Sequence, residues 1–82
     1  MTPERAFGNV LKKLRERREL SQEKLGFACG FHRTYISMLE RGRYSPTLDA
    51  LFRLHRVLKV SPSAILRRVE PMVTAVRKKK SD

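Results

Sequence analysis

Two glycines enclose one short stretch of the chain, and its pattern predicts a single helix between Gly30 and Gly42. Ile36 and Leu39 lie three residues apart, so they share a helix face and are expected to point into a core. The opposite face carries two guanidinium groups, two hydroxyls and one flexible apolar side chain: Arg33, Thr34, Ser37, Met38 and Arg41. Such a face offers the groups that read base edges in the DNA major groove, although polar residues opposite a core are most often simply solvated. The neighbouring segments decide between these two interpretations.

Length and charge narrow the kinds of partner that the chain can have. With 82 residues it forms one domain, whose helices must share a single small core. Lys and Arg total 19 while Asp and Glu total 8, so the net charge is +11. This charge favours a polyanion, which means DNA, RNA or an anionic membrane. We expect no membrane partner, because no apolar run spans a bilayer, no signal peptide is recognisable, and the small core needs the apolar helix faces.

Residues that carry catalytic or metal chemistry are few. The single cysteine, Cys29, excludes an internal disulfide and a multi-cysteine zinc site, and its place on an apolar face makes it a small core residue. His32 and His55 have no cysteine or carboxylate cluster near them in the sequence, so no metal site is expected. There is no Ser-His-Asp or Cys-His arrangement and no glycine-rich phosphate loop. The sequence therefore predicts that the protein is not an enzyme and that it binds no cofactor and no small-molecule ligand.

Capping residues and helical periodicity predict five helices and no strand, a compact all-α bundle with a central helix-turn-helix. The predicted N-caps are Thr2, Ser21, Thr47 and Ser61. The first helix is expected to reach about Arg18, and Pro71 is expected to end the last one. The predicted apolar stripe of the fourth helix consists of Leu48, Leu51, Phe52, Leu54 and Leu58. We expect residues 1–70 to form the helix-turn-helix domain and residues 71–82 to be a basic, partly disordered tail.

The sequence resembles the lambda-repressor-like helix-turn-helix family over about residues 5–69. The motif residues are Leu20-Ser21-Gln22-Glu23-Lys24-Leu25, Gly30, Tyr35-Ile36-Ser37, Glu40-Arg41-Gly42, Ser45-Pro46-Thr47-Leu48 and Leu51. Within that family the chain is similar to the Cro and phage-repressor branch, the XRE-type regulators. The run from His32 to Ser37, with Glu40-Arg41-Gly42, is also similar to controller proteins of restriction–modification systems, a run that many XRE-type regulators share.

The resemblance implies a sequence-specific transcription regulator of bacteria or phages, cytoplasmic and nucleoid-associated. It would bind a two-fold operator on double-stranded DNA as a homodimer, with helix 32–41 in the major groove. The alternatives are a non-specific nucleic-acid-bridging module and an antitoxin-type interaction protein. The implied base readers are Arg33, Thr34, Ser37 and Met38. Arg33 alternatively clamps a phosphate, Ser37 alternatively bonds a carbonyl of its own helix, and Met38 alternatively fills surface space.

The phosphate contacts implied by the resemblance surround this helix: Gln22, Tyr35, Arg41, Arg43, Tyr44, Ser45 and Thr47. A solvated Gln22 and a purely structural Tyr35 are the alternatives. Arg15 and Glu40 match a buried or half-buried ion pair of the family, which positions the helix rather than reading DNA.

Three further expectations concern packing. We expect the dimer surface to involve Phe52, His55 or Ile65, although His55 also fits a histidine at the edge of the core. Gly26 replaces the family's usual alanine where the second and third helices approach closely. His32 stands where the family has a better capping residue, so we expect a weak or water-mediated cap at the start of the third helix.

Overall fold

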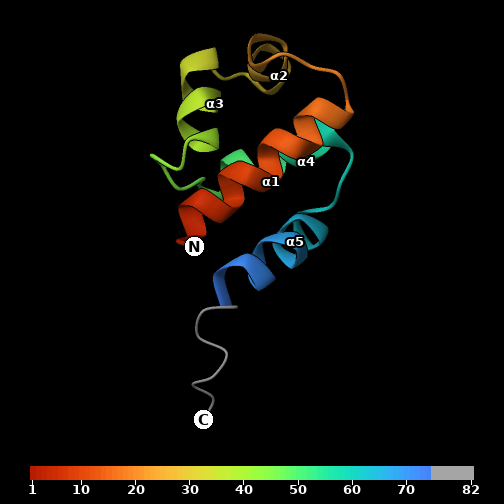
Figure 1. Ribbon diagram of the computed structural model, residues 1–82. Helices are drawn as coiled ribbons and strands as arrows, with labels where there is room; N and C mark the ends of the chain where they lie inside the picture. Colours follow the sequence, from red (N-terminus) through yellow and green to blue (C-terminus); the bar gives the residue numbers. More distant parts are fainter. Residues whose placement is uncertain (75–82) are drawn as a thin grey trace.

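The computed structural model consists of five helices joined by short loops (Figure 1). In chain order they are α1 (Pro3–Arg17), α2 (Gln22–Cys29), α3 (Arg33–Glu40), α4 (Leu48–Leu58) and α5 (Pro62–Thr74). The structure describes residues 1–74, and this part contains no strand. The predicted all-α bundle of five helices is therefore confirmed.

The predicted N-caps all form. In α1, α2, α4 and α5 the hydroxyl of the capping residue accepts a hydrogen bond from the backbone N–H three residues later, at 3.0–3.2 Å. The capping residues are Thr2, Ser21, Thr47 and Ser61. Each bond satisfies one of the amides that a helix N-terminus otherwise leaves without a partner, which explains why the starts of these helices are readable from sequence.

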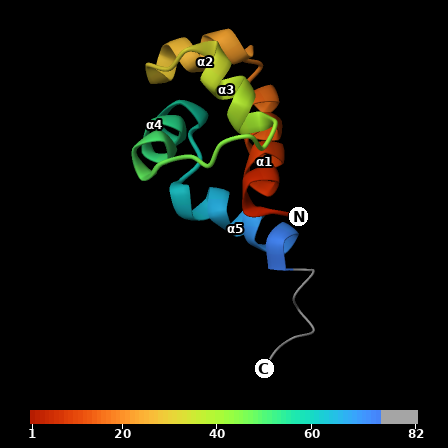
Figure 2. The ribbon, with the colours of Figure 1, turned by 90° about the vertical axis from the view of Figure 1, so that its left-hand side faces the viewer.

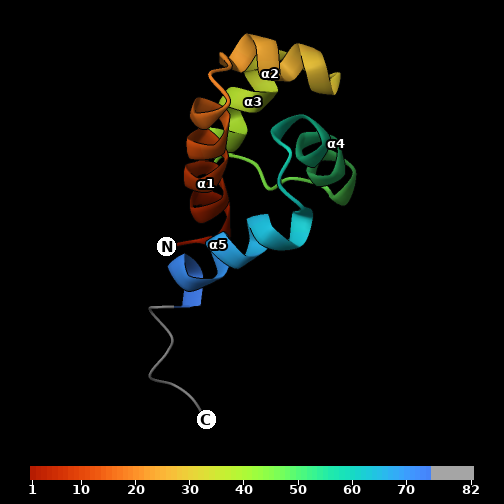
Figure 3. The same ribbon diagram turned by 90° about the vertical axis from the view of Figure 1, so that its right-hand side faces the viewer.

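The helices form two groups along the molecule. In all three views α2 and α3 lie at one end and α5 lies at the other, with α1 and α4 between them (Figure 1, Figure 2 and Figure 3). α3 packs on α1 and α2, whereas α4 packs on α2 and α5. The shared core contains the predicted inward residues Cys29, Ile36 and Leu39. The outer face of α3 is thus left uncovered at the end of the molecule formed by α2 and α3.

The apolar stripe of α4 differs from the prediction. Leu51, Leu54 and Leu58 are buried, but Leu48 is 74% exposed and Phe52 is 49% exposed. Leu48 and Phe52 lie four residues apart and therefore share a face of their own. That face turns away from the core, and the small side chain of Ala50 is buried in its place.

The prediction that Pro71 ends the last helix is wrong, because α5 continues through Pro71 to Thr74. Proline has no N–H to donate to the carbonyl four residues earlier, so a helix rarely tolerates it. Here Met72 and Val73 pack against the core beyond the proline, and the Thr74 hydroxyl donates to the Glu70 carbonyl at 3.0 Å. This packing carries the helix past Pro71. The rest of the predicted tail, residues 75–82, lies outside the described residues.

Among helices α1 to α5 none is both long and apolar enough to cross a membrane.

Candidate nucleic-acid interface

The turn between α2 and α3 is tight because two glycines allow it. Gly30 adopts a left-handed conformation with φ of +83°, and the Phe31 N–H donates to the Gly26 carbonyl at 2.8 Å. A Cβ atom on Gly26 would lie only 2.7 Å from the Phe31 carbonyl oxygen. Gly26 therefore lets the chain close this turn, and the turn sets the angle at which α3 leaves α2.

The start of α3 is capped by His32 directly, which corrects the expectation of a weak or water-mediated cap. The Nδ1 atom of His32 accepts a hydrogen bond from the Thr34 N–H at 3.0 Å. An imidazole nitrogen accepts in the same way as the hydroxyl of a usual capping residue. The first turn of α3, which carries Arg33 and Thr34, is consequently ordered without a serine or aspartate.

The outer face of α3 brings together three of the four predicted base readers. Arg33 and Thr34 are exposed, and Ser37 is half-buried. With Gln22 at the start of α2 they line one hollow of about 350 Å³. Met38 is half-buried and does not line this hollow. A guanidinium, two hydroxyls and an amide in one hollow provide donors and acceptors that match base edges and phosphate oxygens.

At the C-terminal end of α3, Glu40 forms an ion pair with Arg15 of α1. The Arg15 Nε atom donates to Glu40 Oε2 at 2.6 Å, and Nη2 donates to Oε1 at 3.0 Å. The side chains are only 11% and 3% exposed, respectively. The hydrogen bond with Glu40 raises the pKa of the Arg15 guanidinium. Gln22 Nε2 also donates to Glu40 Oε1 at 3.0 Å, so part of the Gln22 amide is committed to this network.

Gly8 of α1 is a packing position for α3 that the sequence pattern did not predict. A Cβ atom there would lie 2.5 Å from the carbonyl oxygens of Leu39 and Glu40, which belong to the backbone of α3. The two helices therefore cross with their backbones almost in contact. The available signal was a glycine inside an otherwise good helix pattern, which often marks a packing reason.

The loop after α3 lies against the start of α1. Gly42 has φ of +74° and approaches Arg5, while Arg41, Arg43 and Tyr44 are exposed. The Ser45 hydroxyl instead donates to Glu4 Oε2 at 2.9 Å. Backbone hydrogen bonding at the start of α1, and then this Ser45 bond, lower the pKa of Glu4.

Three of the predicted phosphate contacts therefore have hydrogen-bond partners within the protein: Gln22, Ser45 and Thr47. The Ser45 hydroxyl donates its hydrogen bond to Glu4, and the Thr47 hydroxyl caps α4. Tyr35 is half-buried, and its ring centroid lies 4.8 Å from that of Phe31 and 6.2 Å from that of Tyr44. Burial raises the pKa of the Tyr35 hydroxyl, so it stays protonated.

The predicted dimer residues fall in two different environments. Phe52 and His55 lie on the outer side of α4, with their rings 5.9 Å apart and edge to face. Ile65 is only 1% exposed, so it belongs to the core and cannot contribute to a surface. Its neighbour Leu66 is 50% exposed. Periodicity marks an apolar helix face but does not say which of two adjacent residues the bundle covers.

Within residues 1–74 no group of acidic, histidine and cysteine side chains is arranged to hold a metal ion.

Comparisons with known proteins agree with this arrangement. A helix-turn-helix family model matches residues 11–65. The chain is 41% identical over 61 residues to the control protein C.BamHI of Bacillus amyloliquefaciens, a match that covers 73% of this chain and 75% of that protein. The solved restriction–modification controller protein C.AhdI from Aeromonas hydrophila superposes with a TM-score of 0.72 at 34% identity, over 74% of this chain and 92% of that one.

A second solved structure, the clp gene regulator ClgR from Corynebacterium glutamicum, has a TM-score of 0.86 over 98% of this chain and 85% of that one, and its 21% identity supports the fold alone. The relatives are named as control and controller proteins, and another, from Sinorhizobium fredii, is named as a transcriptional regulator of the helix-turn-helix type. The exposed face of α3 and the family match together lead to one conclusion: the chain belongs to the helix-turn-helix family of DNA-binding transcription regulators.

Proposed function

We propose that the protein binds a two-fold operator as a homodimer and reads its half-sites with the exposed face of α3. The observation that carries this proposal is the hollow lined by Gln22, Arg33, Thr34 and Ser37 on a helix whose other face is fully buried. Arg33 suits a guanine edge, and the hydroxyls of Thr34 and Ser37 suit a base or a phosphate. Beyond the end of α3 lie Arg41, Arg43 and Tyr44, which would contact phosphates of the DNA backbone.

The dimer part of the proposal rests on site size and on α4. One eight-residue helix reads only a few base pairs, so two copies on half-sites one helical turn apart give a site of useful length. Leu48, Phe52 and His55 recur at helical spacing on the outer side of α4, and Leu66 of α5 is also exposed. Leu48, Phe52 and His55, the α4 face, supply the surface that a second copy would cover, and Leu66 offers further exposed apolar area on α5.

The relatives suggest the biological setting. Because C.BamHI is named as a control protein and C.AhdI as a restriction–modification controller, we propose that this protein regulates genes of a restriction–modification system. A cytoplasmic location follows from DNA as the partner.

Selection of bound sequences from a random DNA pool tests the proposal. We expect a palindromic consensus, and the distance between its halves gives the half-site spacing. Recovery of sequences without any consensus would instead support the non-specific bridging module, and co-purification of a second protein would support the antitoxin-type alternative.

Substitution of Arg33 tests base readout. Arg33→Met should reduce the preference for operator over random duplex by about tenfold or more, since one bidentate contact contributes about 1–3 kcal/mol of discrimination. Arg43→Met is the matched control. It should weaken binding to both duplexes equally and reduce the slope of log affinity against log salt concentration by about 1, the value for one phosphate contact. Equal weakening of both duplexes by Arg33→Met would show that Arg33 is a phosphate clamp.

Substitution of the α4 face tests the dimer. Phe52→Glu should convert the dimer to a monomer in sedimentation velocity, because it places a charge in a desolvated interface. Phe27→Glu is the control, since Phe27 is 87% exposed on the outer side of α2 and outside the α4 face. An unchanged dimer in Phe52→Glu would place the interface elsewhere.

A further inference from the structure

We propose that Arg53 of α4 is a positioning residue for the recognition helix, because it ties the turn between α2 and α3 to α4. The proposal builds on the proposed function, since its consequence is measured as a loss of operator preference. The main packing partners of α3 are α1 and α2. Arg53 connects α4 to the residues that precede α3, namely Cys29 and Phe31.

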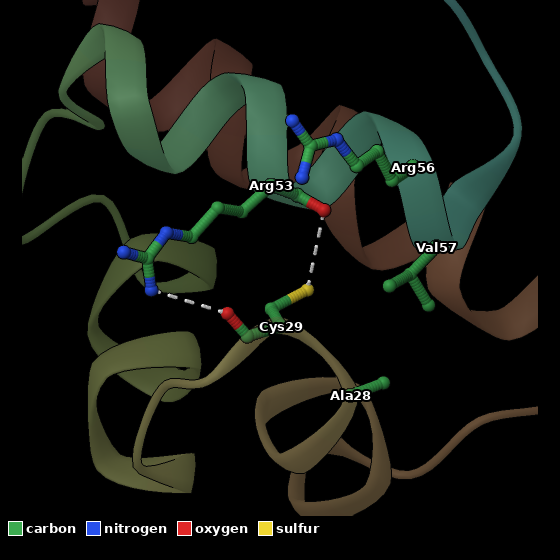
Figure 4. Close-up of a pocket in the computed structure, with 5 residues that line it drawn as sticks. All are labelled: Ala28, Cys29, Arg53, Arg56 and Val57. Carbon is green, nitrogen blue, oxygen red and sulfur yellow. Dashed lines mark hydrogen bonds between the residues drawn. The ribbon is translucent and has the colours of Figure 1, made fainter.

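Arg53 reaches this turn with both its backbone and its side chain. Its Nη1 atom donates to the Cys29 carbonyl at 3.4 Å, and the Cys29 thiol donates back to the Arg53 carbonyl at 3.6 Å (Figure 4). Cys29 is the last residue of α2, a helix that has no basic residue of its own in its last turn. A guanidinium at this end satisfies a free carbonyl and complements the negative end of the helix dipole.

The same guanidinium is held from two further sides. Its Nε atom forms an ion pair with Asp49 Oδ2 at 3.0 Å, one turn earlier on α4. Its central carbon lies 5.3 Å from the centre of the Phe31 ring, close enough for a cation–π contact. The Nη1 atom also lies 3.2 Å from the place where a Cβ on Gly30 would stand. Arg53 thus covers the left-handed glycine and the residue after it.

These contacts continue toward the base readers. The Phe31 ring contacts the Tyr35 ring in a tilted arrangement, with centroids 4.8 Å apart, and the Tyr35 centroid lies 6.2 Å from that of Tyr44. Arg53 therefore contacts the first of three neighbouring aromatic side chains. Arg33 begins α3 only two residues after Phe31. Exposed ion pairs add little stability, and the Arg53 side chain is 44% exposed. We therefore expect Arg53 to affect the direction in which α3 leaves the turn more than the free energy of unfolding.

Arg56 provides a matched control for a substitution of Arg53. It is an exposed arginine on the same helix and lines the same hollow of about 320 Å³ with Ala28, Cys29, Arg53 and Val57 (Figure 4). Within residues 1–74 it makes no hydrogen bond or ion pair. Arg53→Met and Arg56→Met remove the same charge, so any difference between them comes from the contacts of Arg53.

The experiment measures the ratio of operator to random-duplex affinity at fixed salt, with the operator taken from the pool selection. Arg53→Met should lower this ratio about fivefold, while Arg56→Met should leave it unchanged. Asp49→Asn removes the ion pair that holds the Arg53 side chain and makes the protein more positive. If Arg53 acts only through its charge, this variant should bind both duplexes more tightly. A positioning role predicts that Asp49→Asn lowers the ratio, by about twofold.

Amide hydrogen exchange of free protein provides a second measurement that needs no operator. Arg53→Met should speed exchange over residues 30–36, and Arg56→Met should not. The proposal would be overturned if Arg53→Met and Arg56→Met had the same ratio of operator to random-duplex affinity and the same amide exchange rates over residues 30–36. It would also be overturned if Arg53→Met weakened binding to both duplexes equally and lowered the salt dependence of binding, because that result identifies Arg53 as a phosphate contact. If the wild-type protein shows no operator preference, the proposed function fails, and the exchange difference alone then decides whether Arg53 orders the turn.

Discussion

The two ends of α3 show how one short helix is held by two kinds of contact. At its C-terminal end the backbone lies against Gly8 of α1, and Glu40 is paired with Arg15 in a nearly closed site. At its N-terminal end the contacts are side-chain contacts near the surface, namely the His32 cap and the neighbouring Arg53. Breaking a buried ion pair strongly lowers the free energy of unfolding, whereas exposed side-chain contacts add little to it. We therefore expect variants at the C-terminal end to lose stability and variants at the N-terminal end to lose operator preference.

The largest expected effect is the loss of the Glu40 carboxylate. Glu40→Ala leaves Arg15 charged and only 11% exposed without its partner, so we expect the free energy of unfolding to fall by about 3–5 kcal/mol in urea denaturation. The exposed Glu16→Ala should change it by less than about 0.5 kcal/mol. The double variant Arg15→Met, Glu40→Leu should be less destabilised than Glu40→Ala, since no charge remains buried. Similar values for Glu40→Ala and Glu16→Ala would show that the C-terminal end does not depend on this pair.

The next effect concerns the crossing of α1 and α3. Gly8→Ala should lower the free energy of unfolding by about 2–3 kcal/mol, because its Cβ meets two backbone oxygens that cannot rotate away. Asn9→Ala on the exposed side of α1 is the control and should be neutral or slightly stabilising in thermal unfolding. A wild-type melting temperature for Gly8→Ala would mean that the two helices separate at little cost.

A smaller effect is expected at the exit from α3. Gly42→Ala places a Cβ at φ of +74° and beside Arg5, so unfolding should become easier by about 1–2 kcal/mol. Lys59 has the same left-handed conformation with φ of +59°, at the end of α4. Lys59→Gly should therefore be neutral or stabilising, and calorimetry of the two variants compares the strain directly. Destabilisation of Lys59→Gly as large as that of Gly42→Ala would argue against backbone strain as the cause.

The smallest effect on stability is expected at the His32 cap. His32→Ala should lower the free energy of unfolding by only about 0.5–1 kcal/mol. It should nevertheless reduce the preference for operator over random duplex, because Arg33 and Thr34 lie in the turn that His32 orders. His32→Ser restores a capping oxygen and should restore the preference. A loss of stability without a loss of preference would contradict the division between the two ends of α3.

Local chemistry made much of this molecule predictable. The four hydroxyl caps, the left-handed Gly30 and the inward pair Ile36 and Leu39 all follow from short-range rules, and the structure confirms them. The hollow on α3 was also foreseeable, since helical spacing alone puts Arg33, Thr34 and Ser37 on one side. The role of Arg15 and Glu40 came from resemblance, because a pair separated by 25 residues leaves no periodic signal.

The sequence by itself determined that the chain forms five helices and that the third is short, with one apolar face and one polar face, because capping and periodicity depend on neighbours in the chain. Only the tertiary structure decided which faces are covered. It buried Ile65 and exposed Leu66, carried α5 past Pro71, engaged Ser45 with Glu4 and brought Arg53 onto the turn before α3. These outcomes depend on contacts between helices far apart in the chain, and such contacts are decided by packing volume and geometry rather than by local preference.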